Sequence, residues 1–143
     1  MLVSQILKSK TPGVATIDPG ASVSDAVAAL SGRRIGALVV SSDGQTALGI
    51  LSERDIVREL GQNGAACLSA KVDEIMTRNP VSCQPGDMAD VVLQKMTDGR
   101  FRHLPVVDGG RMVGLISIGD VVKARLDELN VEKDALEGMI KGF

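Results

Sequence analysis

Two copies of a serine and an aspartate in fixed spacing are the residues of this sequence that could do chemistry. The copies are Gly49–Asp55 (GILSERD) and Gly114–Asp120 (GLISIGD), which begin 65 positions apart. In each copy the two aliphatic residues predict a buried strand. Ser-x-x-Asp ahead of an apolar pattern then predicts the start of a helix. Two copies in matching frames indicate that the chain is an internal duplication.

These serines and aspartates have two physical interpretations. As a helix cap, Ser52 and Ser117 would accept a hydrogen bond from a backbone N–H three residues on, and Asp55 and Asp120 would bond back. As a ligand site, the free N–H groups and positive dipole end would suit an anion or a polar ligand edge. A carboxylate on that first turn can also accept two hydrogen bonds from a ribose diol. A single copy would be more typical of a helix cap. A second copy in a matching frame makes the ligand-site interpretation more favourable.

Composition restricts the function classes. The 143 residues are 44% hydrophobic and contain no Trp or Tyr, so aliphatic side chains must fill the core. A net charge of −2 gives no electrostatic reason to expect nucleic acid as a partner. The two cysteines, Cys67 and Cys83, are too few for a disulfide framework or a zinc site. Without an apolar run of membrane-spanning length or a signal peptide's apolar core, we expect a soluble cytoplasmic protein with no membrane partner.

The elements around the motifs repeat in the same order. The first half predicts a strand at 14–17, a helix from 23 to 30, strands at 35–40 and 47–51, and a helix from Ser52 to about Gly61. A small-residue loop at 62–70 and a short helix at 71–76 lead into the second half. That half predicts a strand at 79–82, a helix from 89 to 96, a strand at 101–106 and a tight turn at 108–110, mostly 66 positions after the first.

The expected fold class is therefore α+β (α/β), with two β-α-β-β-α repeats packed through their sheets about a pseudo-two-fold axis. We assign residues 1–66 to the first repeat with an N-terminal helix, 67–127 to the second, and 128–143 to a C-terminal helix extension.

This repeat resembles the cystathionine-β-synthase (CBS) domain, and the chain is similar to a stand-alone bacterial CBS pair, or Bateman module. The resemblance covers about residues 1–127 and rests on four stretches in order. They are Gly49–Asp55, Gly114–Asp120, Glu74–Pro80 and Arg102–Val107.

The resemblance implies two adenosine-compound sites in the cleft between the repeats, for AMP, ADP, ATP or NAD(H). It assigns the ribose hydroxyls to Asp55 in one site and to Asp120 in the other, with Ser52 and Ser117 contacting ribose or phosphate. It assigns the base pockets to Ile35, Gly36 and Ala37, and to His103, Leu104 and Pro105. It assigns the covering face to Thr16 and Ile17, and to Asn79, Pro80 and Val81. Phosphate candidates by motif position are Arg54, Arg102 and His103, and Ile118 is a further contact within the second motif. His103 could equally be a core histidine.

Sequence motifs of catalysis, metal binding and phosphate-cradling glycine loops do not appear, so we expect no enzyme and no catalytic cofactor. The expected function is a regulatory sensor that binds an adenine nucleotide and signals energy or redox state to an unknown effector protein. The alternative is a structural dimerising adaptor with no physiological nucleotide. Near-heptad spacing predicts a helix that needs an apolar neighbour, its own chain or a second copy, through Val122, Leu126, Leu129, Leu136 and Ile140. The family resemblance implies that this neighbour is a second copy, in a homodimer. The weaker alternative for this helix is a docking surface for an unknown protein. Gly138 and Gly142 predict that its last turn frays.

Overall fold

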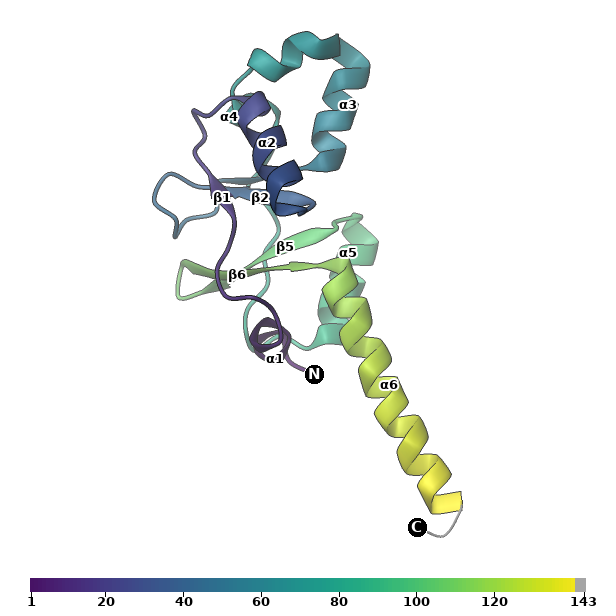
Figure 1. Ribbon diagram of the computed structural model, residues 1–143. Helices are drawn as coiled ribbons and strands as arrows, with labels where there is room; N and C mark the ends of the chain where they lie inside the picture. Colours follow the sequence, from purple (N-terminus) through teal and green to yellow (C-terminus); the bar gives the residue numbers. More distant parts are fainter. Residues whose placement is uncertain (141–143) are drawn as a thin grey trace.

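The computed structural model describes residues 1–140, and its alternating helices and strands confirm the predicted α+β class (Figure 1). The elements of the first half are α1 Val3–Lys8, β1 Thr16–Ile17, α2 Val23–Arg33, β2 Ala37–Val40, β3 Gly49–Ser52 and α3 Glu53–Asn63. A 3-10 helix, η1 Gly64–Ser69, connects them to the second half. The elements there are α4 Val72–Ile75, β4 Thr77–Arg78, α5 Ala89–Gly99, β5 His103–Asp108, β6 Arg111–Ser117 and α6 Ile118–Ile140.

The first sheet has the strand order β1-β2-β3-β4. Strand β2 is its centre: it pairs with β1 in parallel and with β3 antiparallel, and all four of its residues are buried. This is the burial expected of a continuous apolar run covered on both faces. Strand β4 comes from the second half of the chain and pairs with Gly49 and Ile50 of β3. The first sheet is therefore completed by residues that follow the first repeat.

The second sheet is the hairpin β5–β6. Gly109 and Gly110 join its strands with φ values of 59° and 83°, a conformation that glycine adopts without steric cost and that suits a two-residue hairpin turn. Cys83 makes an isolated parallel bridge to Val106, 66 positions after the pairing of Ile17 with Val40.

The strand predicted at 79–82 is wrong. Residues 77 and 78 form β4 instead, on the first sheet, and only Cys83 takes the position that β1 has in the first repeat. Between them Asn79 has a positive φ of 47°, which no regular strand contains. The predicted loop at 62–70 also differs, because α3 continues past Gly61 and η1 follows it.

The short helices before each repeat are exchanged between the two cores. Val3 and Ile6 of α1 are buried among residues of the second repeat, with Val92, Leu104 and others. Val72 of α4 is buried in the core of the first repeat. In Figure 1, α1 accordingly lies with β6 and α5 and away from α2 and α3. The N-terminal helix that chain order groups with residues 1–66 thus packs in space on the second repeat.

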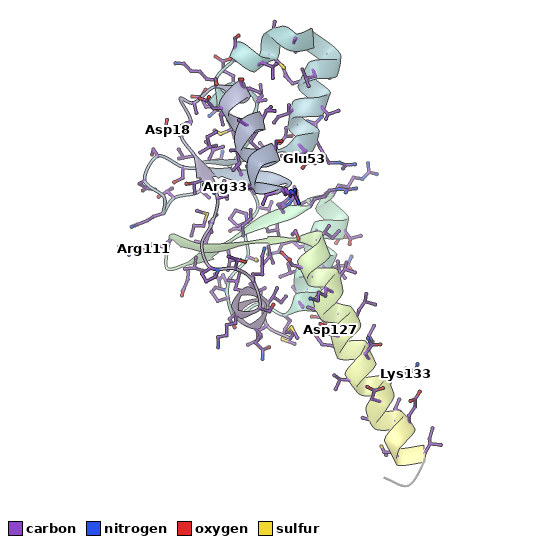
Figure 2. All side chains as sticks on the ribbon, in the orientation of Figure 1. Asp18, Arg33, Glu53, Arg111, Asp127 and Lys133 are labelled. Carbon is purple, nitrogen blue, oxygen red and sulfur yellow. The ribbon has the colours of Figure 1, made fainter. Side chains whose placement is uncertain are left out.

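Helix α6 runs far beyond the second core. It has 23 residues, and only Val121 and Ala124 are buried. Figure 1 shows the rest projecting from the body, and Figure 2 shows Asp127 and Lys133 along that projection. The predicted apolar stripe is exposed, from 39% for Val122 to 85% for Ile140. Gly138 lies inside the helix, and Gly142 lies outside the described residues. No helix within residues 1–140 is both long and apolar enough to cross a membrane.

Candidate functional site

Two clefts lie between the repeats, and each contains one of the serine–aspartate motifs. We call them the Asp55 cleft and the Asp120 cleft after the aspartate that lines each one. Their volumes, about 590 Å³ and 580 Å³, are within the range of small-molecule sites. A hydrogen bond from the Met112 N–H to the Gln45 carbonyl (2.8 Å) joins the two repeats beyond them.

In the Asp55 cleft, the motif forms the predicted capping box at the start of α3. The Asp55 N–H donates to Ser52 Oγ (3.2 Å), and the Ser52 N–H and Oγ both donate to Asp55 Oδ2 (2.9 and 3.0 Å). Asp55 Oδ1 lies 3.6 Å from Arg58 Nη1. The cap therefore fixes the carboxylate at the wall of the cleft through one oxygen, and the cap and ligand interpretations are compatible.

In the Asp120 cleft, the second motif caps α6 and also makes an ion pair. The Asp120 N–H donates to Ser117 Oγ (3.1 Å), and the Ser117 N–H donates to Asp120 Oδ2 (2.8 Å). Lys10 Nζ donates to the same Oδ2 (2.6 Å) and to the Leu115 carbonyl (2.7 Å). Burial raises the pKa of Asp120, but the bonds from Lys10 and Ser117 outweigh it and hold this pKa below its ordinary value.

The two clefts differ in charge. The Asp55 cleft combines five arginines with two carboxylates: Arg54, Arg58, Arg78, Arg100, Arg102, Glu53 and Asp55. Among residues 1–140, the cations that line the Asp120 cleft are Lys10 and Arg33, against the carboxylate of Asp120. Arginine forks suit phosphate oxygens, so the Asp55 cleft is the more favourable surroundings for a polyphosphate. In Figure 2, Arg33 and Glu53 lie where the first repeat faces the second.

His103 and Gly36 line both clefts. A Cβ on Gly36 would be 3.8 Å from His103 Cε1 and Nε2, so the imidazole packs directly over this backbone. Burial, reinforced by the positive charge of Lys10, lowers the pKa of His103 below 6.5 despite the opposing charges of Asp120 and Glu53. The lowered pKa favours the neutral imidazole at pH 7, which can stack and can donate or accept one hydrogen bond.

The structure brings most of the predicted site residues to the clefts. In the Asp120 cleft these are Ile35, Gly36, Ala37, His103, Ser117 and Asp120. In the Asp55 cleft they are Gly36, Ser52, Arg54, Asp55, Asn79, Pro80, Val81, Arg102, His103 and Leu104. Whether they bind a nucleotide stays a prediction.

Four predicted residues line neither cleft: Thr16, Ile17, Pro105 and Ile118. Thr16 and Ile17 form β1, which is placed by its pairing with β2, and the segment just before it, 11–15, covers the cleft instead. Pro105 is buried in β5, and Ile118 packs against the second core.

Five cations that line the clefts are not among the predicted site residues: Lys10, Arg33, Arg58, Arg78 and Arg100. For Arg33 and Arg100 the sequence carries a signal, because the arginines at 33–34 and at 100 and 102 begin matching strands and could cap the cleft at its surface. Lys10 has no such sequence signal. The residue 66 positions after it is not its structural counterpart, because the exchanged helices repeat at a different spacing from the strands.

A family comparison matches the CBS domain model to residues 3–62 and 72–127. The chain belongs to the CBS domain family. Among curated relatives, the CBS domain-containing protein CBSX3, mitochondrial, of Arabidopsis thaliana is 36% identical over 150 residues, covering 98% of this chain and 72% of the relative. Of several longer CBS proteins from the same plant, the chain covers about a quarter.

Solved CBS structures superpose on nearly the whole chain. The CBS-domain containing protein ATU1752 from Agrobacterium tumefaciens is 44% identical, with a TM-score of 0.83 over 87% of this chain and 99% of its own. Two more distant CBS structures contain ligands. PAE2072 from Pyrobaculum aerophilum is complexed with AMP (27% identical, TM-score 0.75, 84% of this chain and 89% of its own). The CBS pair of MJ0100 is complexed with 5′-methylthioadenosine and S-adenosyl-L-methionine (29% identical, TM-score 0.77, 90% and 98%).

Proposed function

We propose that this CBS pair is a regulatory module that binds an adenine nucleotide, AMP, ADP, ATP or NAD(H), between its repeats. The observation that carries the proposal is the position of Asp55 and Asp120, each on the first turn of a helix and at the wall of a cleft of ligand size. Such a carboxylate is placed to accept ribose hydroxyls, as an acidic residue does in dinucleotide folds. The adenosine ligands of PAE2072 and the MJ0100 pair support the same ligand class here.

A regulatory output requires that a ligand bind two states of the protein with different affinity. His103 and Gly36, which line both clefts, are where occupancy of one cleft would reach the other. The signal would then pass to an effector protein. We propose no catalytic role, because the clefts offer capping pairs and cations and no assembled nucleophile and base.

The test is nucleotide binding by calorimetry, with Asp55→Asn and Asp120→Asn as variants. Asparagine keeps an acceptor for the Ser52 or Ser117 N–H, so the caps should survive, while the carboxylate that would accept a ribose diol is lost. We expect each variant to weaken binding at its own cleft by about tenfold or more, with a melting temperature within a few degrees of wild type. Wild-type protein that binds none of AMP, ATP and NADH would leave the structural adaptor as the better description.

The lack of Trp and Tyr provides a direct check for ligand retained during purification. Protein without these residues absorbs little in the near ultraviolet, so a bound adenine would dominate the spectrum. Acid release followed by mass spectrometry would identify it.

We also propose that the chain forms a homodimer through α6. Leu126, Leu129 and Leu136 are 48–59% exposed on a helix that projects from the body, where a second copy could cover them. Leu129→Glu should shift sedimentation to the monomer, whereas Lys123→Glu, also on α6, changes charge without removing apolar surface and should not. A wild-type protein that sediments as a monomer at micromolar concentration would exclude the dimer.

A further inference from the structure

The two clefts are related by the duplication, yet one position differs in a way that affects the motif aspartate. Equivalent residues of the two exchanged helices lie 69 positions apart. Leu2, just before α1, bridges Met88, and Lys71, just before α4, bridges Ser22 in the same way. The same spacing relates Leu7 to Met76, which pack over the motif glycines Gly114 and Gly49. Three residues further on, it relates Lys10 to Asn79. A lysine in the Asp120 cleft therefore has an asparagine as its counterpart in the Asp55 cleft.

Lys10 occupies the oxygen of Asp120 that a serine hydroxyl occupies at Asp55. In the Asp55 cleft, Ser52 Oγ donates to Oδ2 at 3.0 Å. In the Asp120 cleft, Lys10 Nζ approaches Oδ2 to 2.6 Å and is held by the Leu115 carbonyl as well. The pair is half-buried, with side-chain exposures of 32% and 25%. The nearest cation at Asp55 is 3.6 Å away on Arg58, which is 64% exposed.

An ammonium on Oδ2 of Asp120 competes with a hydroxyl that would bind the same oxygen. A ligand diol that spans both carboxylate oxygens must displace Lys10 from Oδ2, and the displaced charge then needs another anion. Arg33 lines the same cleft, whereas its counterpart at a spacing of 66 is Gly99, which has no side chain. A phosphate in the Asp120 cleft would therefore have two cations to receive it once Lys10 has moved.

We infer that Lys10 is a specificity-determining residue of the Asp120 cleft, one that excludes uncharged nucleosides and admits nucleotides whose phosphate can take over the ammonium. The inference rests on the proposed binding of a ribose at Asp120. It makes the two clefts unequal: a diol at Asp55 loosens only a 3.6 Å contact with the exposed Arg58, whereas a diol at Asp120 must first break the 2.6 Å bond from the half-buried Lys10.

The test compares adenosine with AMP on Lys10→Met, in an Asp55→Asn background that weakens the other cleft. Methionine keeps the apolar stem of the lysine and removes its charge. We expect the affinity for adenosine to rise about fivefold, the factor that a half-exposed ion pair supplies at its upper limit. The preference for AMP over adenosine should fall by at least the same factor. Lys8→Met, at an exposed position at the end of α1, is the matched control and should change neither affinity.

The outcomes separate this inference from the proposed function. If AMP binds but Lys10→Met leaves the affinity for adenosine unchanged or lower, Lys10 is not a competitor and the inference is wrong, while the proposed function stands. If adenosine binds only after Lys10→Met, the inference is supported in its strongest form. If no variant binds either compound, the inference is wrong, and the binding of ATP and NADH to the wild type decides the proposed function separately. Thermal unfolding of each variant checks that the fold is retained.

Discussion

The two motif glycines should respond differently to the same small substitution. Glycine begins each motif because the exchanged helix places a side chain directly against it. At Gly114, an added Cβ would lie 2.6 Å and 2.9 Å from the two terminal carbons of Leu7. At Gly49 it would lie 2.5 Å from Met76 Sδ and 2.8 Å from the carbonyl oxygen of Thr77. The first clash is with the end of a flexible side chain, and the second includes backbone.

The difference in free energy follows from what can move. Leu7 is only partly buried and can leave its rotamer, which costs about 1 kcal/mol. Thr77 cannot retreat in the same way, because it is paired with Ile50 in the β3–β4 ladder. Gly49→Ala should therefore destabilise the protein by about 2 to 3 kcal/mol, the usual cost of overpacking. We expect Gly114→Ala to cost about 1 kcal/mol.

Urea unfolding followed by far-ultraviolet circular dichroism measures both, since there is no Trp to report by fluorescence. The double variant Gly114→Ala/Leu7→Ala tests the cause, because it removes the three side-chain atoms nearest to the new methyl. Its two changes should cost less together than their sum. Equal losses at the two glycines, or a greater loss at Gly114, would refute the reasoning.

Two further predictions concern single titratable groups. Because burial lowers the pKa of His103 below 6.5, the folded protein keeps this ring neutral while the unfolded chain takes up a proton. Stability from this residue is therefore present above about pH 6.5 and falls as the pH drops below it. Urea unfolding at neutral and mildly acidic pH should show this loss, and His103→Gln should reduce it. Burial raises the pKa of the Cys83 thiol to about 11. The negative charge of Asp87 adds to this increase, and the positive charge of Lys95 opposes it. Iodoacetamide should thus label Cys83 far faster in urea than in the native protein, as peptide mass spectrometry can measure.

Much of the fold could be predicted because its signals are local. The run at 35–40 is apolar throughout and contains the central strand β2, and the Gly109–Gly110 pair forms the hairpin turn it predicts. The N-caps at Ser52 and Ser117 follow from spacing alone. The strand at 79–82 failed for a non-local reason. Thr77 and Arg78 pair with β3 of the first sheet, Asn79 turns the chain with a positive φ, and only Cys83 reaches the position of β1.

Contacts between distant parts of the chain limited the prediction of the site. The motif residues reached the clefts because each lies next to a helix start that its own sequence defines. Thr16 and Ile17 did not, because sheet pairing and not the cleft decides where β1 lies. The contact between Lys10 and Asp120 could not be predicted, because the two residues are 110 positions apart in the sequence. The packing of α1 on the second repeat brings them together.

The exchange of α1 and α4 sets an order in which the chain can complete its cores. The first core needs nothing beyond β4, so it can close once residue 78 has left the ribosome. The second core needs Val3 and Ile6, which are made before the whole first repeat, together with Val121 and Ala124 on α6. The apolar side of α1 therefore stays exposed to solvent until about 110 more residues have been synthesised and a very long loop has closed. Folding of the second repeat should accordingly be the slow step, and neither repeat expressed alone contains all of its own core.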